Sequence, residues 1–185
     1  MAKTESKMIA LDTIAPDFTL NTCFDESIHF NSIVGKKGYL IAFICNHCPY
    51  VIRIREGLNI LTKNLQEKGL SVLCINSNDV DNYPEDSIEK MKEYAEKYHF
   101  PFSYLFDPTQ EVAKAYSATC TPDFFLFNSD RKLFYRGRMD KANPSNEVDN
   151  NGIDILNAAD EMLAGRISPE IQIPSIGCNI KWKKD

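Results

Sequence analysis

The stretch Gly38-Tyr-Leu-Ile-Ala-Phe-Ile-Cys-Asn-His-Cys-Pro49 decides how this chain folds. Residues 38–44 form an unbroken run of apolar, β-forming residues, which predicts a central strand buried on both faces. After Pro49 the apolar side chains follow helical spacing, and proline suits the first turn of a helix because its missing N–H loses no partner there. The apolar positions of this helix are Val51, Ile54, Leu58, Leu61 and Leu65. The stretch therefore predicts a strand, a Cys-x-x-Cys turn and a helix that stops at Lys68-Gly69.

The rest of the chain mixes short strands with helices. Two apolar runs joined by the turn Asn128-Ser-Asp-Arg131 predict a late hairpin. Further strands are expected within 13–20, after residue 28, at 70–75 and at 102–106, and further helices at 86–98, 108–116 and 153–163. This order predicts one α/β domain over residues 1–185, with a mixed central sheet and helices on both faces. Its core spans about 14–165, with an N-terminal β extension and a tail at 166–185 that packs along the surface.

Composition and charge exclude several classes of protein. The chain has 185 residues with 21 basic and 26 acidic side chains, a net charge of −5. Surfaces for nucleic acid or anionic lipid need clustered Lys and Arg, so neither partner is expected. No apolar run approaches the roughly 20 residues that span a bilayer. The apolar stretch at residues 8–11 is too short for a signal-peptide core, so we expect a cytoplasmic location.

The number of cysteines is the most informative feature of the composition. Six cysteines in a chain expected in a reducing compartment are more readily free or functional thiols than structural disulfides. Cys45 and Cys48 have C-x-x-C spacing at a strand–helix junction, where unpaired N–H groups and the helix dipole favour a thiolate. A zinc site would need a second cysteine pair, and none is present, so we expect no metal and no organic cofactor. This pattern favours redox chemistry.

Three further segments extend the pattern to a family. Together with Cys45-Asn-His-Cys-Pro-Tyr-Val51, the segments Ala15-Pro-Asp-Phe-Thr-Leu20 and Thr121-Pro-Asp-Phe-Phe-Leu-Phe127 resemble the thioredoxin-like superfamily. More closely, the chain resembles the redoxin branch grouped with alkyl hydroperoxide reductases, and within it peroxiredoxin-like proteins. The segment Pro174-Ser-Ile-Gly-Cys-Asn-Ile-Lys-Trp-Lys183 is similar to the C-terminal signature of that subgroup. The resemblance covers about residues 14–183 and implies a thioredoxin-like fold.

The resemblance also implies which residues shape the site. Pro122, preceded by Thr121, corresponds to a cis-proline that faces the active cysteines, in a loop that offers backbone groups to a bound peptide or mixed disulfide. Asn46, His47 and Pro49 belong to the active turn. Cys120 could face the same pocket as a second resolving thiol, whereas Cys178 is expected to be structural or exposed.

Two alignments with the family disagree about which thiol attacks. Read as an ordinary redox pair, Cys45 is the nucleophile and Cys48 resolves. Counted from the central strand, the attacking cysteine lies about five residues after Phe43, which is Cys48. We favour Cys48 as the nucleophile, because the helix N-terminus next to it should stabilise its thiolate. Cys45 would then be its disulfide partner.

Peroxiredoxins offer a second comparison. Cys48-Pro49 matches their peroxidatic Cys-Pro, but Cys45 stands where they carry an activating threonine. Arg136 and Arg138, on or after the late strand, are candidates for their activating arginine.

The resulting prediction is a thiol–disulfide oxidoreductase whose partners are a thiol donor and a disulfide-bearing protein. The alternatives are a peroxidase in which Cys48 passes through sulfenic acid, and a redox sensor without turnover. Either a monomer or a homodimer fits the sequence.

Overall fold

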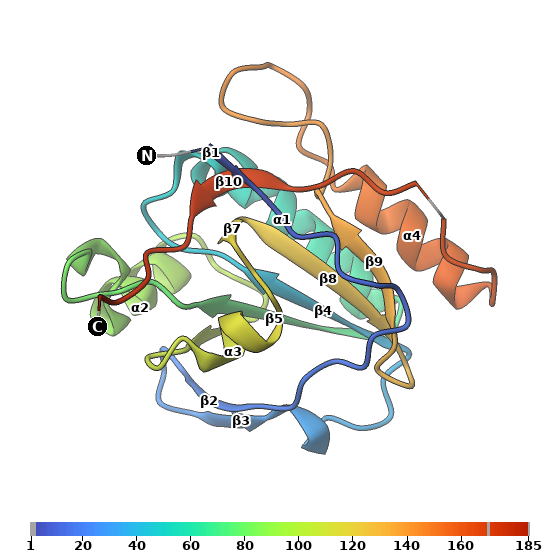
Figure 1. Ribbon diagram of the computed structural model, residues 1–185, viewed down its shortest axis with the longest axis horizontal. Helices are drawn as coiled ribbons and strands as arrows, with labels where there is room; N and C mark the ends of the chain where they lie inside the picture. The colour runs from blue at the N-terminus through green and yellow to red at the C-terminus, as the bar shows by residue number, and fades with distance from the viewer. Residues whose placement is uncertain (1–2, 170, 185) are drawn as a thin grey trace.

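The structure is a computed structural model that describes residues 3–169 and 171–184 (Figure 1). Residues 1, 2, 170 and 185 of the predicted domain lie outside the described residues. The main sheet has seven strands in the order β3-β2-β6-β5-β4-β8-β9. Central β4 (Gly38–Phe43) runs parallel to β5 (Leu70–Asn76) and antiparallel to β8 (Asp123–Asn128). Every residue of β4 is buried, so the predicted central strand is confirmed.

The remaining strands of this sheet extend it on both sides of β4. They are β2 (Thr19–Thr22), β3 (Ser27–His29), β6 (Ser103–Phe106) and β9 (Leu133–Gly137). β5 and β6 are parallel, whereas β2 pairs antiparallel with both β3 and β6. β8 and β9 form the predicted antiparallel hairpin. Two short 3₁₀ helices, η1 (Phe30–Ser32) and η2 (Pro84–Asp86), lie in the connections.

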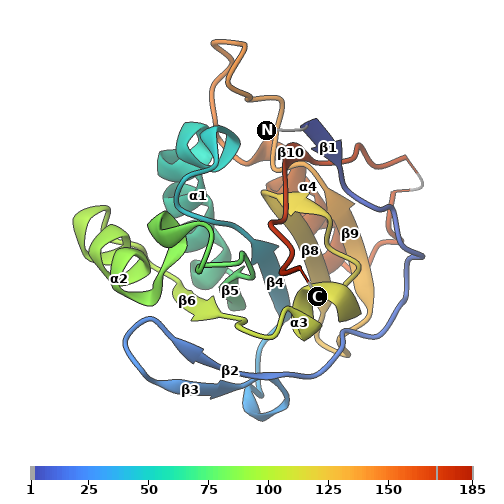
Figure 2. The same cartoon turned by 60° about the vertical axis from the view of Figure 1, so that its left-hand side comes forward.

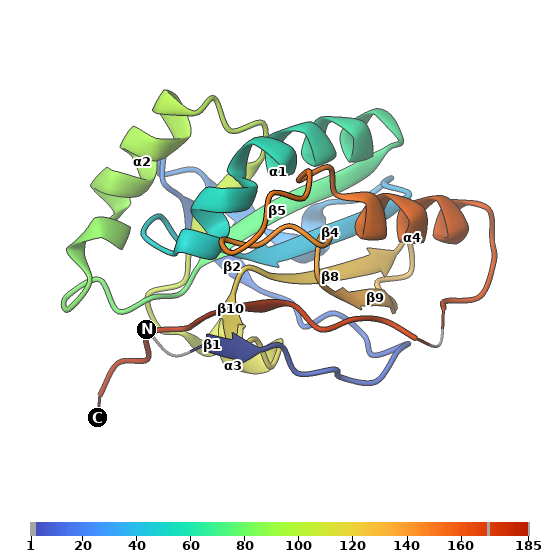
Figure 3. The same ribbon diagram turned by 90° about the horizontal axis from the view of Figure 1, so that it is seen from above.

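Helices cover both faces of the main sheet, as predicted. They are α1 (Pro49–Glu67), α2 (Ile88–Lys97), α3 (Glu111–Ala115) and α4 (Ile153–Leu163). Figure 3 shows α1, α2 and α4 on one side of the sheet and α3 on the other. β4 accordingly sends Leu40 and Ala42 into the apolar cluster beneath α1, and Ile41 and Phe43 into the opposite cluster. Among the described residues, no helix is both long and apolar enough to cross a membrane.

A second, three-stranded sheet joins the two ends of the chain. Its order is β1-β10-β7, with β1 (Lys3–Glu5), β10 (Ile176–Asn179) and β7 (Cys120–Thr121) all antiparallel. Figure 2 shows β10 lying beside β1, close to the start of α1. The prediction that the tail packs along the surface is wrong for this part, because Gly177 and Cys178 are buried. The backbone groups of β7 and β1 make β10 a strand although its sequence has no strong β pattern.

Gly177 provides a test of how closely β10 lies against β7. A Cβ atom at this position would overlap the carbonyl oxygen of Thr121, and a backbone atom cannot turn aside as a side chain can. We expect Gly177→Ala to lower the free energy of unfolding by about 2 kcal/mol or more. Denaturant unfolding measures this loss, with exposed Ile171→Ala, expected within about 0.5 kcal/mol of the parent, as control. Equal stability of the two variants would contradict the close backbone approach.

Candidate active site

Cys45 and Cys48 lie between the end of β4 and the start of α1. Cys48 is the N-cap residue of α1, with extended backbone angles (φ −71°, ψ 122°), and its carbonyl accepts the Ile52 N–H at 2.9 Å. Pro49 follows in the first turn, where the helix needs no N–H from it. Both thiols are buried, with exposed fractions of 2 % and 0 %. The sequence prediction of a strand–turn–helix junction is therefore confirmed at this site.

Thr121 brings the two thiols into contact with the loop opposite. The peptide bond between Thr121 and Pro122 is cis, as the family resemblance implied. The Cys48 Sγ lies 3.1 Å from the Thr121 carbonyl oxygen, to which the protonated thiol donates. The Cys45 Sγ shares a hydrogen bond of 3.4 Å with the Thr121 hydroxyl. One residue of β7 thus contacts both members of the pair.

The two thiols differ in acidity because one donates a hydrogen bond to the other. The bond from the Cys45 thiol is the largest influence on Cys48 and, against the effect of burial, lowers the pKa of Cys48 to about 5. The Cys178 thiol and the Val51 backbone add hydrogen bonds in the same direction. The pKa of Cys45 is raised well above its usual range, because Cys45 donates this hydrogen bond to Cys48, is buried, and lies near the Asp86 carboxylate. Cys48 is therefore the thiol that ionises first.

Ionisation changes the partners of Cys48. The protonated thiol donates to the Thr121 carbonyl, whereas a thiolate can only accept and is repelled by that oxygen. This repulsion opposes the fall of the pKa, but four donors act the other way, the thiols of Cys45 and Cys178 and the backbone N–H groups of Val51 and Cys178. Since hydrogen bonds to a charged acceptor are roughly twice as strong as neutral ones, we conclude that the pKa of Cys48 is lowered.

A pH titration tests this conclusion. Because the pKa of Cys48 is lowered to about 5, its thiolate forms as the pH rises through that value, well before an ordinary thiol with a pKa of about 8.5 ionises. The ultraviolet absorbance of thiolate, taken as the difference between the parent chain and Cys48→Ser, should therefore rise in the acidic range and stay flat above neutrality. Cys23→Ala, which alters a buried thiol outside this turn, is the control and should keep the acidic step. A first step near pH 8.5 would contradict the lowered pKa.

The two residues between the cysteines are held by a buried polar network. The Asn46 backbone N–H donates to Asp86 Oδ1 at 2.8 Å, and the Asn46 side chain accepts from the Tyr104 hydroxyl at 3.0 Å. The His47 Nδ1 lies 2.7 Å from Asp86 Oδ2, and its ring stacks on Tyr83 at 5.5 Å. The hydrogen bond to Asp86 is the main reason that the pKa of His47 is raised. The turn is therefore fixed by a carboxylate from outside it.

Asp86 is a site residue that the sequence did not reveal. The acidic run 79–86 suggests a solvated loop, which holds for exposed Asp81 and Glu85 but not for the two ends of the run, since Asp79 is 3 % and Asp86 0 % exposed. The Asn78 side chain also donates to Asp86 Oδ2, at 2.7 Å. A carboxylate can be buried where donors surround it, and three reach Asp86. Only the fold brings these donors together.

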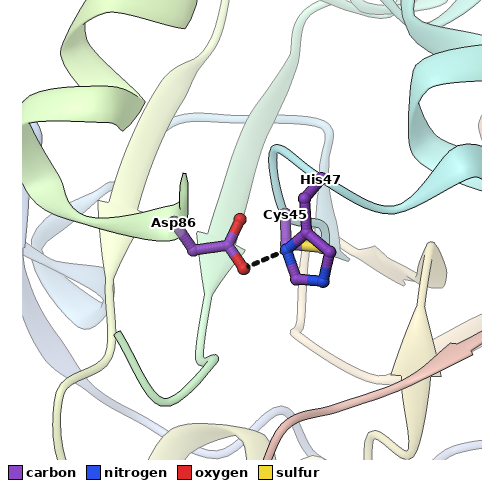
Figure 4. Close-up of side chains that lie close together, drawn as sticks. All are labelled: Cys45, His47 and Asp86. Atoms are coloured by element: carbon purple, nitrogen blue, oxygen red, sulfur yellow. Dashed lines mark hydrogen bonds and ion pairs between the residues drawn. The ribbon is translucent and has the colours of Figure 1, made fainter. Parts of the chain in front are cut away.

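Cys45, His47 and Asp86 also form a set of possible metal ligands. One donor atom from each lies within 4.8 Å of the others (Figure 4). The Asp86 oxygens already accept hydrogen bonds from Asn46, His47 and Asn78. A cation would have to displace the His47 bond, and the arrangement is fully accounted for by hydrogen bonding.

Cys120 and Cys178 are both buried near Cys48. Cys120 is buried beside the site, but its thiol donates to the Pro122 carbonyl at 3.6 Å, and burial raises its pKa. Cys178, expected to be structural or exposed, is 4 % exposed and donates a hydrogen bond to Cys48. The third thiol next to Cys48 is therefore Cys178. The C-terminal signature includes Cys178, but its place beside Cys48 depends on the pairing of β10 with β7.

A cleft opens beside the cis-proline. Tyr50 at the start of α1, Pro122 and Ile176 of β10 line it together with Arg138 and Lys141. Arg138 donates to Asp154 at 2.7 Å. Arg136, the other arginine considered from the sequence, donates instead to the Ile9 carbonyl and to Gln172. The hydrogen-bond partners of both arginines thus lie away from the two thiols.

Solved structures show the fold. A conserved protein of Geobacillus kaustophilus, described as uncharacterized, superposes with a TM-score of 0.96 at 46 % identity, covering 100 % of this chain and 98 % of the other. The thioredoxin domain of a thiol-disulfide oxidoreductase from Bacteroides vulgatus superposes with a TM-score of 0.62 at 16 % identity, covering 80 % and 97 %. The predicted thioredoxin-like fold is confirmed.

Sequence comparison agrees with the structure. Thiol-disulfide oxidoreductase ResA of Geobacillus kaustophilus is 27 % identical over 140 residues, which cover 75 % of this chain and 76 % of that protein. The AhpC/TSA family model matches residues 11–136, more than half of the chain and including the Cys45–Cys48 turn and the cis-proline loop. The chain belongs to the AhpC/TSA family and has a thioredoxin-like fold.

Proposed function

We propose that this protein is a thiol–disulfide oxidoreductase in which Cys48 is the attacking thiolate and Cys45 its disulfide partner. One observation carries the proposal: Cys48 is the N-cap residue of α1, where the unpaired N–H groups of the helix favour a thiolate, and hydrogen bonding from Cys45 lowers its pKa to about 5. The thiolate is the nucleophile in thiol–disulfide exchange. The curated relatives named thiol-disulfide oxidoreductase support the same reaction class.

The reaction has two balanced steps. The Cys48 thiolate attacks one sulfur of a substrate disulfide, forming a mixed disulfide, and the other substrate sulfur leaves as a thiolate that takes up a proton. Cys45 then attacks the Cys48 sulfur, forming the Cys45–Cys48 disulfide, and its proton passes to the second leaving thiolate. The substrate gains two electrons and the cysteine pair loses them. A thiol donor returns the pair to the reduced form.

The order of these steps follows from the hydrogen bond between the thiols. While Cys48 is a thiolate, it holds the Cys45 proton, which is the largest cause of the raised pKa of Cys45. In the mixed disulfide Cys48 carries no charge, so this cause disappears. Cys45 therefore becomes easier to ionise only after Cys48 has reacted.

The partners follow from the same chemistry. A disulfide-bearing protein would approach through the cleft beside Pro122, where Tyr50 and Ile176 supply apolar surface. A thiol donor is needed to complete each cycle, which suits the reducing compartment predicted from the sequence. The cytoplasmic location itself stays a prediction.

The test compares two oxidants on the reduced full-length chain. One portion receives an equimolar peptide disulfide and the other equimolar hydrogen peroxide, free thiols are blocked with N-ethylmaleimide, and the peptides are mapped by mass spectrometry. We expect faster reaction with the disulfide, with Cys48 in a disulfide bond. Faster reaction with peroxide and sulfenic acid at Cys48 would favour the peroxidase instead. Unreacted Cys48 in both portions would contradict the proposed function.

Turnover separates an enzyme from a sensor. With excess substrate disulfide and a thiol donor, an oxidoreductase consumes the donor continuously. A single equivalent of donor consumed per chain would contradict catalysis and identify a redox switch.

A further inference from the structure

β10 pairs with the backbone of β7, immediately before the cis-proline. Cys178 pairs with Thr121 and Asn179 with Cys120, immediately before Pro122. Thr121 is also the residue whose carbonyl and hydroxyl contact the thiols of Cys48 and Cys45. The backbone edge that the family resemblance assigns to a bound peptide or mixed disulfide is thus occupied by a strand of the same chain. Cys178 belongs to that strand and lies directly opposite Thr121.

The segment is held firmly in this place. Gly177 leaves no room for a side chain against the Thr121 carbonyl. Beyond β10, the Ile180 N–H donates to the Thr119 carbonyl at 3.1 Å, and the Lys181 N–H donates to Asn78 Oδ1 at 2.9 Å. Cys178 is consequently presented to Cys48 by an ordered strand rather than by a free tail.

Cys178 lies beside Cys48. Both belong to one buried cluster, Cys178 pairs with the Thr121 whose carbonyl contacts the Cys48 thiol, and hydrogen bonds from the thiol and the backbone of Cys178 lower the pKa of Cys48. Burial first, and then the hydrogen bond that it donates to Cys48, raise the pKa of Cys178 to about 12. As with Cys45, the second cause exists only while Cys48 is a thiolate. Cys45 and Cys178 therefore both become easier to ionise, and so able to attack, once Cys48 is part of a mixed disulfide.

Local charge distinguishes these two thiols. The Asp86 carboxylate lies near Cys45 and opposes its ionisation. Lys181, three residues beyond Cys178 on the same segment, acts in the opposite direction and favours the Cys178 thiolate. The nearby charges therefore do not favour Cys45 over Cys178 as the thiol that attacks the mixed disulfide at Cys48.

We propose that Cys178 is a second redox partner of Cys48, and that an intramolecular Cys48–Cys178 disulfide forms during the reaction and ties β10 to the start of α1. The proposal rests on the proposed function, since it uses the same attacking thiolate. In the balanced step, the Cys178 thiolate attacks Cys48 in its mixed disulfide, the Cys48–Cys178 bond forms, and the substrate thiolate leaves with the Cys178 proton. Because both disulfides use Cys48, attack by Cys45 on Cys48 would exchange one for the other and release Cys178.

The experiment removes the competing thiol. Reduced full-length Cys45→Ser is treated with bis(hydroxyethyl) disulfide, a small disulfide, blocked with N-ethylmaleimide and mapped by mass spectrometry. We expect a Cys48–Cys178 disulfide and two hydroxyethyl thiols released per chain. A product that stops at the Cys48 mixed disulfide, with one thiol released and Cys178 blocked by N-ethylmaleimide, would overturn the proposal while leaving the proposed function intact. Cys48 unreacted in the parent chain would overturn both.

A second measurement does not depend on Cys45→Ser folding normally. Cys178→Ala in the otherwise unchanged chain removes the thiol that donates to the Cys48 thiolate. We expect the acidic thiolate step of Cys48 to move to higher pH, and Cys23→Ala to leave it in place. An unmoved step in Cys178→Ala would show that the Cys178 thiol does not act on Cys48 and would overturn the proposal.

Discussion

Cys48→Ser is expected to lower the rate of disulfide reduction by about a thousandfold or more, to the rate of the other buried thiols. A serine hydroxyl does not ionise in this pH range and cannot form a disulfide, so the first step has no nucleophile. The measurement is the steady-state reduction of a peptide disulfide in the presence of a thiol donor. Cys23→Ala is the matched control, because it removes a buried thiol outside the site and should retain the parent rate.

Cys45→Ala should have a smaller and different effect. It removes the strongest hydrogen bond to the Cys48 thiolate but leaves the nucleophile in place. Hydrogen bonds to charged groups are worth about 1.5–3 kcal/mol, so the acidic limb of the pH–rate profile of the first step should move up by about one to two pH units, while the rate at neutral pH changes little. A larger loss of rate at neutral pH in Cys45→Ala than in Cys48→Ser would mean that the alignment with Cys45 as nucleophile is correct.

Asp86→Asn is expected to lower the free energy of unfolding by about 3 kcal/mol, or about 10 °C in Tm for a chain of this size. The carboxylate is fully buried and accepts from the Asn46 N–H, the Asn78 amide and His47. An asparagine amide would place donors against donors in at least one of these contacts. Thermal and denaturant unfolding measure the loss.

The control for Asp86→Asn comes from the same loop. Asp81 is exposed, and Asp81→Asn removes the same charge without touching the buried network, so its stability should stay within about 0.5 kcal/mol of the parent. Equal effects of the two substitutions would mean that net charge, rather than the network around Asp86, accounts for the loss. The same experiment shows whether the active turn depends on this carboxylate, since Asn46 and His47 are both bound to it.

The parts of the fold that follow local rules could be read from the residues. Residues 38–44 are apolar throughout, and β4 is buried on both faces. The helical spacing after Pro49 and the stop at Lys68-Gly69 match α1, which ends at Glu67. The hairpin of β8 and β9 likewise follows from its turn residues. In each of these cases the pattern and the burial concern neighbours in the sequence.

The pairing of Cys45 with Cys48 and the place of the turn before α1 are local properties, and so the residues themselves indicate redox chemistry. The burial of Asp86 and the approach of Cys178 to Cys48 are not local, because each depends on donors or strands far away in the chain. A carboxylate without hydrogen-bond donors is costly to bury, and a short strand is not stable without a neighbouring strand to pair with. Only the tertiary structure supplies those partners, which is why it, and not the sequence pattern, identifies Asp86 and Cys178 as parts of the site.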